Sequence, residues 1–122
     1  MILRGGKAAN YDAQSVQQTS EEMEANGVAP MIMIDVSHAN SDKDYRRQPI
    51  VIENVCEQVA AGDHRIMGVM VESHLVAGRQ DLVEGQPLTY GQSITDGCIG
   101  WDDTELVLNQ LAEAVKARRA KQ

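Results

Sequence analysis

The sequence predicts an α/β protein in which strands of a parallel sheet alternate with helices. The main evidence is two apolar runs, each followed by polar side chains: residues 31–36 (MIMIDV), which only Asp35 interrupts, and residues 66–71 (IMGVMV). Strands that are apolar on both faces are typical of a parallel sheet that helices cover on each side. The 122 residues supply one domain of modest size at most, so residues 1–122 are treated as one unit.

The composition excludes several classes of protein. The net charge is −7, and the 11 Lys and Arg residues are scattered apart from a cluster at 116–121, whereas nucleic-acid binding needs a concentrated basic face. No apolar run approaches the ~20 residues that cross a bilayer. The two cysteines, Cys56 and Cys98, are too far apart to suggest a disulfide scaffold. We therefore expect a cytoplasmic protein with no nucleic-acid partner and no membrane span.

The N-terminal region predicts the end of a strand, a turn and a helix. Residues 2–3 form the strand end, and Arg4 follows at its rim with two glycines after it. Arg4 is suited to binding an anion beside the glycine N–H groups, or is an ordinary surface arginine near the terminus. Residues 12–26 predict a helix with Asp12 as its N-cap and Gly27 just past its end.

The segment after the first full strand predicts a second helix that ends near Gly62. Val51, Val55 and Val59 have the i, i+4, i+8 spacing of one apolar helix face. Pro49 inside a helix would cost about 3 kcal/mol. We therefore place it in the first turn, where its missing N–H does no harm.

The last helix has the clearest start in the sequence. Asp102 and Glu105 have the spacing of a capping box, and Trp101 and Leu106 occupy the hydrophobic-staple positions around it. The basic cluster at the end of the chain suits the negative end of the helix dipole. The predicted buried stripe consists of Leu108, Leu111, Ala112 and Val115.

The loop over residues 73–100 is too long for a simple connection, because loops above ~15 residues in compact domains are usually functional or disordered. Between Ser73 and Gly100 it carries four glycines, and it ends close to Asp96. It either folds over the strand ends and brings Asp96 into a site, or it is a surface loop.

Polar side chains that follow the two strands predict a metal site. His38 follows the first strand and Glu72 the second, and the carboxyl ends of parallel strands meet at one edge of a sheet. Together with Asp96 they supply ligands for a divalent metal of borderline hardness. His74 is a rival ligand, and Asp35 in the first strand is either an ion-pair partner or a catalytic group.

Two full strands and the end of a third do not make a stable sheet on their own. A complete (β/α)₈ barrel takes ~250 residues. We therefore expect this chain to be the C-terminal part of a larger fold. Its strands would expose unpaired edges and apolar faces. We therefore expect self-association.

Seven segments, in order along the chain, resemble the C-terminal part of type I DAHP synthase. This family makes 3-deoxy-D-arabino-heptulosonate 7-phosphate in the first committed step of the shikimate route to aromatic amino acids. The resemblance covers essentially the whole sequence. The segments are 3–7 (LRGGK), 33–35 (MID), 37–40 (SHAN), 68–73 (GVMVES), 90–91 (YG), 93–96 (SITD) and 98–101 (CIGW).

The resemblance implies a fold, a reaction and a set of site residues. The family fold is a (β/α)₈ TIM barrel, of which this chain would be the end of strand 6 through helix 8, within one catalytic domain. The reaction is a transfer that condenses phosphoenolpyruvate with erythrose 4-phosphate and requires a divalent metal (Mn, Fe, Co or Zn). His38, Glu72 and Asp96 match three of the four metal ligands. Arg4 matches an arginine that holds the phosphoenolpyruvate phosphate, and His38 also lies close to that substrate.

The sequence also departs from the family pattern. The fourth metal ligand of the family is a cysteine on an early barrel strand, and neither Cys56 nor Cys98 corresponds to it. We therefore expect the isolated chain to be inactive or nearly so. The alternatives are a non-catalytic truncated fragment with residual metal or anion binding and a small stand-alone metal hydrolase, for which the sequence offers no general base.

Overall fold

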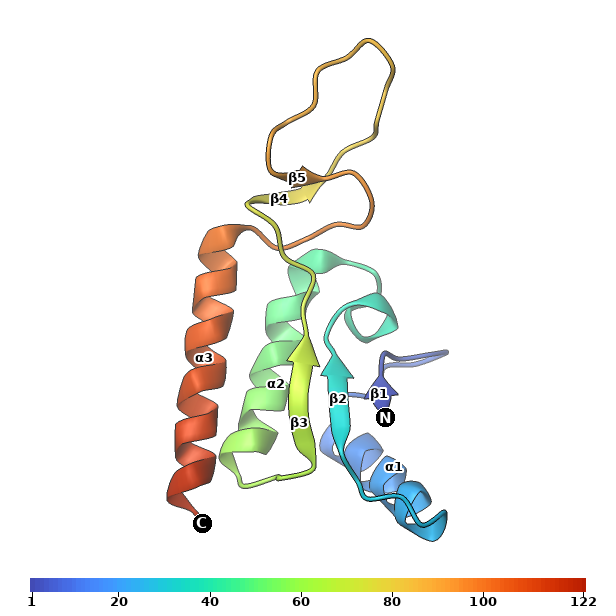
Figure 1. Ribbon diagram of the computed structural model, residues 1–122, viewed down its shortest axis with the longest axis vertical. Coiled ribbons are helices and arrows are strands. Elements are labelled where there is room, and N and C mark those ends of the chain that lie inside the picture. Colours follow the sequence, from blue (N-terminus) through green and yellow to red (C-terminus); the bar gives the residue numbers. More distant parts are fainter.

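A computed structural model describes residues 1–122 (Figure 1). The chain contains three helices and five strands, with two short 3₁₀ turns, His38–Ser41 and Tyr45–Arg47, between the second strand and the second helix. The elements in order are β1 (Ile2–Leu3), α1 (Ala13–Ala25), β2 (Ile32–Asp35), α2 (Gln48–Ala60), β3 (Ile66–Met70), β4 (Val76–Arg79), β5 (Gln92–Ser93) and α3 (Trp101–Ala120).

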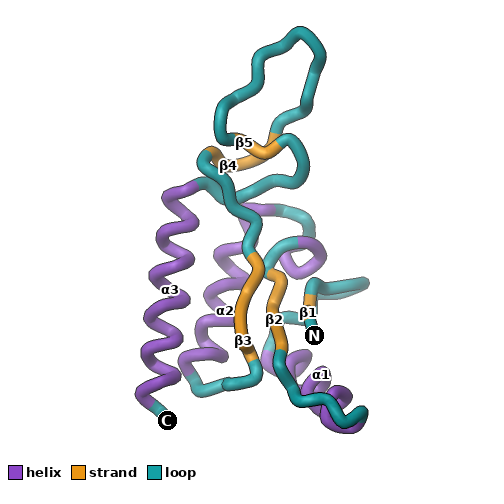
Figure 2. Tube along the Cα trace, in the orientation of Figure 1, coloured by secondary structure: helices purple, strands orange, loops and turns teal.

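The main sheet has the order β1-β2-β3, and both pairings are parallel. Ile34 in the central strand is aligned with Leu3 on one side and with Val69 on the other. Helices α2 and α3 pack against each other along the same side of the sheet, as Figure 2 shows. The α/β class with parallel strands is thus confirmed.

The core is aliphatic, because its buried hydrophobic residues are Ile, Val, Leu, Met and Ala. Ile32 and Ile34 on β2 are fully buried, and α2 contributes Val51, Ile52 and Val55. Each such side chain stabilises the fold by roughly 1.5–3 kcal/mol when it leaves water. The central strand is therefore fixed firmly, and so is the start of the turn that follows it.

The predicted starts of the first two helices are confirmed. Asp12 caps α1, because its carboxylate accepts from the backbone N–H of Ser15 at 3.2 Å and from the Ser15 hydroxyl at 2.6 Å. These hydrogen bonds hold the pKa of Asp12 below its usual range. Pro49 lies in the first turn of α2.

Two predictions for α3 are wrong. The N-cap is Gly100, whose carbonyl accepts from the Thr104 N–H at 3.0 Å and from its hydroxyl at 2.9 Å. Asp102 lies inside the first turn, where its charge still favours the positive end of the helix dipole. The buried stripe is also displaced, because the Thr104 hydroxyl also bonds to Ser73 and turns that face of the helix inward. The buried residues are Thr104, Val107 and Ala114, whereas Leu108 and Ala112 are exposed and Leu111 and Val115 are half-buried.

The 73–100 segment contains a second, two-stranded sheet that the sequence does not predict. Strands β4 and β5 are parallel, and Gly78 forms an additional antiparallel bridge with Cys98. Figure 1 shows the segment extending beyond the carboxyl ends of the main sheet. Strands of four and two residues are too short to give an alternating pattern.

Both edges of the main sheet carry exposed apolar side chains. Ile2 on β1 is 60% exposed and Met67 on β3 is 56% exposed. None of the three helices combines the length and the apolar character that a bilayer span requires. The expected self-association stays a prediction.

Candidate metal centre

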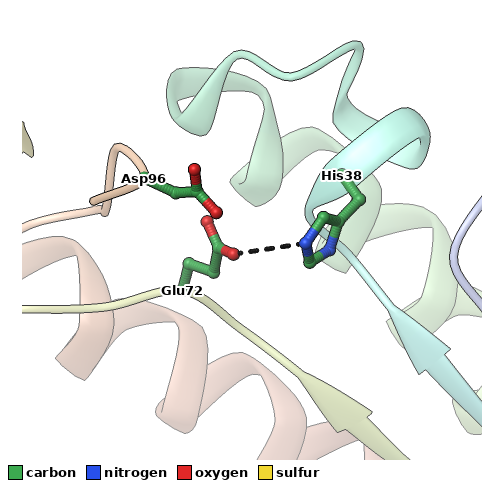
Figure 3. Close-up of side chains that lie close together, drawn as sticks. All are labelled: His38, Glu72 and Asp96. Atoms are coloured by element: carbon green, nitrogen blue, oxygen red, sulfur yellow. Dashed lines mark ion pairs between the residues drawn. The ribbon is translucent and has the colours of Figure 1, made fainter.

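The side chains of His38, Glu72 and Asp96 gather at the carboxyl edge of the main sheet (Figure 3). One ligand atom from each lies within 4.8 Å of the other two. Nε2 of His38 lies 3.6 Å from Oε1 of Glu72. The turn after β2, the end of β3 and the segment after β5 therefore supply one ligand each.

These three side chains fit a divalent cation. Two ligands that are each about 2.1 Å from a shared ion lie ~3–4 Å apart, so small side-chain adjustments bring the three atoms to coordinating distance. One imidazole and two carboxylates suit a borderline cation such as Mn²⁺, Fe²⁺, Co²⁺ or Zn²⁺. Cys56 and Cys98 lie outside the group.

The orientation of His38 is set by Asp35. Oδ2 of Asp35 lies 2.8 Å from Nδ1 of His38, while Oδ1 accepts from the N–H of Ser37 at 2.8 Å. Asp35 is buried, and His38 has a left-handed backbone with φ of 46°. A carboxylate at Nδ1 keeps the proton on that nitrogen and leaves Nε2 as the free ligand atom. Of the two interpretations of Asp35, the structure supports the ion-pair partner.

The backbone of Glu72 is fixed by a residue that the sequence does not single out. Gln48 is fully buried; its Oε1 accepts from the Glu72 N–H at 2.8 Å, and its Nε2 donates to the Glu72 carbonyl at 3.0 Å. The N–H of Ile99 donates to the same carbonyl at 3.0 Å. A buried glutamine at a helix start has no sequence signature that separates it from a surface glutamine.

Asn40 is a second residue that sequence analysis missed. Its Nδ2 donates to the carbonyls of Leu3 at 3.1 Å and Asp35 at 2.8 Å, and its Oδ1 accepts from the N–H of Asn10 at 2.8 Å. Asn40 therefore joins β1 to the turn that carries His38. Gly5 passes so close to Asn40 that an added Cβ would lie 2.8 Å from its backbone nitrogen.

A cavity of about 510 Å³ opens beside the three candidate ligands. Arg4, Lys43 and Arg79 line it together with His38, Glu72 and Asp96. Three cationic side chains around one cavity favour an anionic ligand. Arg4 lines the same cavity as His38, and its anion-binding role stays a prediction.

The thiol of Cys98 lies close to the same carboxylates. Burial raises the pKa of Cys98, and the negative charges of Glu72 and Asp96 raise it further.

Two other histidines lie outside the candidate centre. His74, the predicted rival ligand, is exposed and accepts from the N–H of Leu75 at 2.8 Å. It is not part of the group around His38, and its own N–H donates to the carbonyl of Ile99 at 3.0 Å. His64 lies just before β3, at the opposite end of the strand from Glu72.

Comparisons with known proteins place the chain in one family. The family described as the DAHP synthetase I family matches residues 1–109. A phospho-2-dehydro-3-deoxyheptonate aldolase of Haemophilus influenzae is 57% identical over 98% of this chain and 33% of its own length. The Phe-sensitive aldolase of Escherichia coli strain K12 is 56% identical, over 98% of this chain and 34% of its own length.

A solved structure gives the same result in three dimensions. The aldolase of the same name from Francisella tularensis superposes with a TM-score of 0.91 at 43% identity, over 96% of this chain and 34% of that chain. This chain thus spans about a third of the length of the relatives it matches. The match over residues 1–109 and the ordered likeness to these aldolases show that the chain belongs to the DAHP synthetase I family.

Proposed function

We propose that residues 1–122 form the C-terminal part of one (β/α)₈-barrel catalytic domain, from the end of strand 6 through helix 8. The three parallel strands and the helices between them support this, as does the likeness to one third of the Francisella aldolase. The apolar edges at Ile2 and Met67 are where neighbouring barrel strands would pair. The complete domain is a DAHP synthase of aromatic amino acid biosynthesis, which condenses phosphoenolpyruvate with erythrose 4-phosphate.

His38, Glu72 and Asp96 are the proposed protein ligands of a divalent metal in that domain. When bound, the metal supplies a Lewis acid that polarises an aldehyde oxygen or activates a water molecule. His38 offers Nε2 because Asp35 holds its other ring nitrogen. Glu72 and Asp96 supply two negative charges that offset the charge of the cation.

Arg4 is the proposed partner of the phosphoenolpyruvate phosphate. A guanidinium group has a planar fork of donors that matches phosphate oxygens. Arg4 shares its cavity with His38, so one bound anion would reach both side chains. The backbone next to Arg4 is fixed, because Gly5 packs against Ala39 and Asn40 and its N–H donates to Oδ1 of Asn10 at 2.7 Å.

The observation that carries this proposal is the convergence of His38, Glu72 and Asp96 within 4.8 Å. These residues are far apart in the sequence and match the family's metal-binding motifs. The rest of the relatives' length has no counterpart in the 122 residues. We therefore expect the isolated chain to have little or no synthase activity.

Exchange of the corresponding third of the E. coli Phe-sensitive aldolase for this chain tests the proposal. The exchange should leave a folded enzyme that consumes phosphoenolpyruvate only when erythrose 4-phosphate is present. His38→Ala in the same chimera should abolish turnover, and His64→Ala should not. A folded but inactive chimera would favour the non-catalytic fragment, and turnover by the isolated chain near that of the complete enzyme would contradict its expected inactivity.

A further inference from the structure

We propose that Arg79 is a positioning residue for Asp96. This inference rests on the proposed role of Asp96 as a metal ligand. Arg79 is the last residue of β4, and Asp96 lies in the segment between β5 and α3. The two residues lie 17 positions apart in the sequence, yet the small β4–β5 sheet brings their strands together.

The contact that carries the proposal is a hydrogen bond to the residue just before Asp96. Nε of Arg79 donates to the carbonyl oxygen of Thr95 at 2.7 Å. Nη2 of the same guanidinium donates to Oδ1 of Asp81 at 2.7 Å, so the fork is held at both ends. The Thr95 carbonyl belongs to the peptide group that joins Thr95 to Asp96. Fixing this carbonyl therefore restricts the direction in which the Asp96 side chain leaves the backbone.

Contacts at Gly97 and Cys98 also restrict the chain on the C-terminal side of Asp96. The N–H of Gly78 donates to the carbonyl of Cys98 at 2.8 Å, and the N–H of Cys98 donates back at 3.2 Å. Gly97 lies against the ring of Tyr45, where an added Cβ would approach Cδ1 to 2.6 Å. Asp96 is thus held between a side-chain contact at Thr95 and a strand bridge at Cys98.

The proposed ligands are held in three different ways. Asp35 holds the ring of His38, and Gln48 holds the backbone of Glu72, and both supporting residues are buried. Residues 94–96 are exposed, so Asp96 itself has no packed core around it. A ligand on an exposed segment must lose conformational freedom when a metal binds. Hydrogen bonds that already restrict the segment in the metal-free chain reduce that loss.

The test compares Arg79→Ala with Arg46→Ala in the 122-residue chain. Arg46 is a matched control, because it also forms a fork with an aspartate two positions away, Asp44, at 2.9 and 3.0 Å. Two quantities are measured: amide hydrogen exchange over residues 92–98 without metal, and the Kd for Mn²⁺ by titration. The melting temperature of the metal-free chain is recorded as well.

We expect Arg79→Ala to speed exchange over residues 92–98 and to raise the Kd for Mn²⁺ about tenfold, as loss of an outer support of a metal ligand does. The melting temperature should change little, because the side chain of Arg79 is 48% exposed. Arg46→Ala should leave all three quantities unchanged. Unchanged exchange in Arg79→Ala, or an unchanged Kd despite faster exchange, would overturn the inference. If the unmodified chain binds no Mn²⁺, the proposed metal site fails, and the exchange data still decide whether Arg79 holds the segment.

Discussion

Nδ1 of His38 lies 2.8 Å from Oδ2 of Asp35, and the Asp35 residue is only 4% exposed. The two residues are three positions apart, across the end of β2. A left-handed backbone at His38 brings its ring back over the strand end. The pair directs Nε2 toward Glu72. A contact at the end of the central strand thus orients the imidazole of His38, one of the three candidate metal ligands.

Asp35→Asn should weaken metal binding without unfolding the chain. An asparagine has the same shape, but its amide accepts less strongly from an imidazole and permits the other ring tautomer. We expect the Kd for Mn²⁺ to rise about tenfold, which titration measures. Asp44→Asn is the control, since Asp44 pairs with Arg46. Equal affinities in the two variants would show that Asp35 does not orient His38.

The close approach of Gly5 to Asn40 predicts a large difference between two neighbouring substitutions. Gly5→Ala places a Cβ 2.8 Å from Asn40 backbone nitrogen at a φ of +80°, and should lower the free energy of unfolding by about 2 kcal/mol or more. Gly6→Ala has nothing within 4 Å of the added Cβ. Urea unfolding of both variants measures the difference. Equal stabilities would mean that β1 is not held against the turn at Asn40.

Asp63 should make the stability of the chain depend on pH. Hydrogen bonds from Arg65 hold the pKa of Asp63 below its usual range. A carboxyl with a lowered folded-state pKa stabilises the protein above the unfolded pKa of about 4, and this contribution is lost as the pH falls through the lower folded value.

Asp63→Asn should therefore cost about 1 kcal/mol at pH 7, and the difference from the unmodified chain should shrink below pH 4. Urea unfolding at pH 7 and pH 3 checks both statements. Asp81→Asn is a matched control, because Asp81 also pairs with an arginine two positions away but is 74% exposed. Its loss should be below about 0.5 kcal/mol. A difference at Asp63 that persists unchanged at pH 3 would contradict this account.

The apolar sheet edges should cause self-association of the isolated chain. Ile2→Lys combined with Met67→Lys places a charge on each edge strand, and this should reduce the associated mass in light scattering. Leu82→Lys is the control, because Leu82 is exposed in the 80–91 segment, away from the main sheet. A monodisperse monomer before any substitution would contradict the prediction.

The sequence predicts the parts of the fold that local patterns determine. Largely apolar runs locate β2 and β3, and Asp12 and Pro49 mark helix starts, because each signal arises from residues close in sequence. The start of α3 is mistaken because Asp102 has the residue type of a cap, while the cap itself depends on Gly100 and its contacts with Thr104. The burial of α3 likewise depends on Ser73, which is 31 positions away from Thr104.

The same division applies to the candidate site. His38, Glu72 and Asp96 are detectable because they follow strands or fall in motifs of the family. Their supports, Gln48 and Arg79, are not, because each acts on the backbone of a residue at least 16 positions away. Neither contact leaves a spacing or composition signal. Only the arrangement of the elements in space identifies these two residues.

Metal content most directly tests the central claim that His38, Glu72 and Asp96 bind one divalent cation. The unmodified chain, His38→Ala and His64→Ala are each dialysed against Mn²⁺, and bound metal is measured by elemental analysis. The account predicts about one equivalent in the unmodified chain and in His64→Ala, and little or none in His38→Ala. Equal metal content in His38→Ala and the unmodified chain, or none in either, would contradict it.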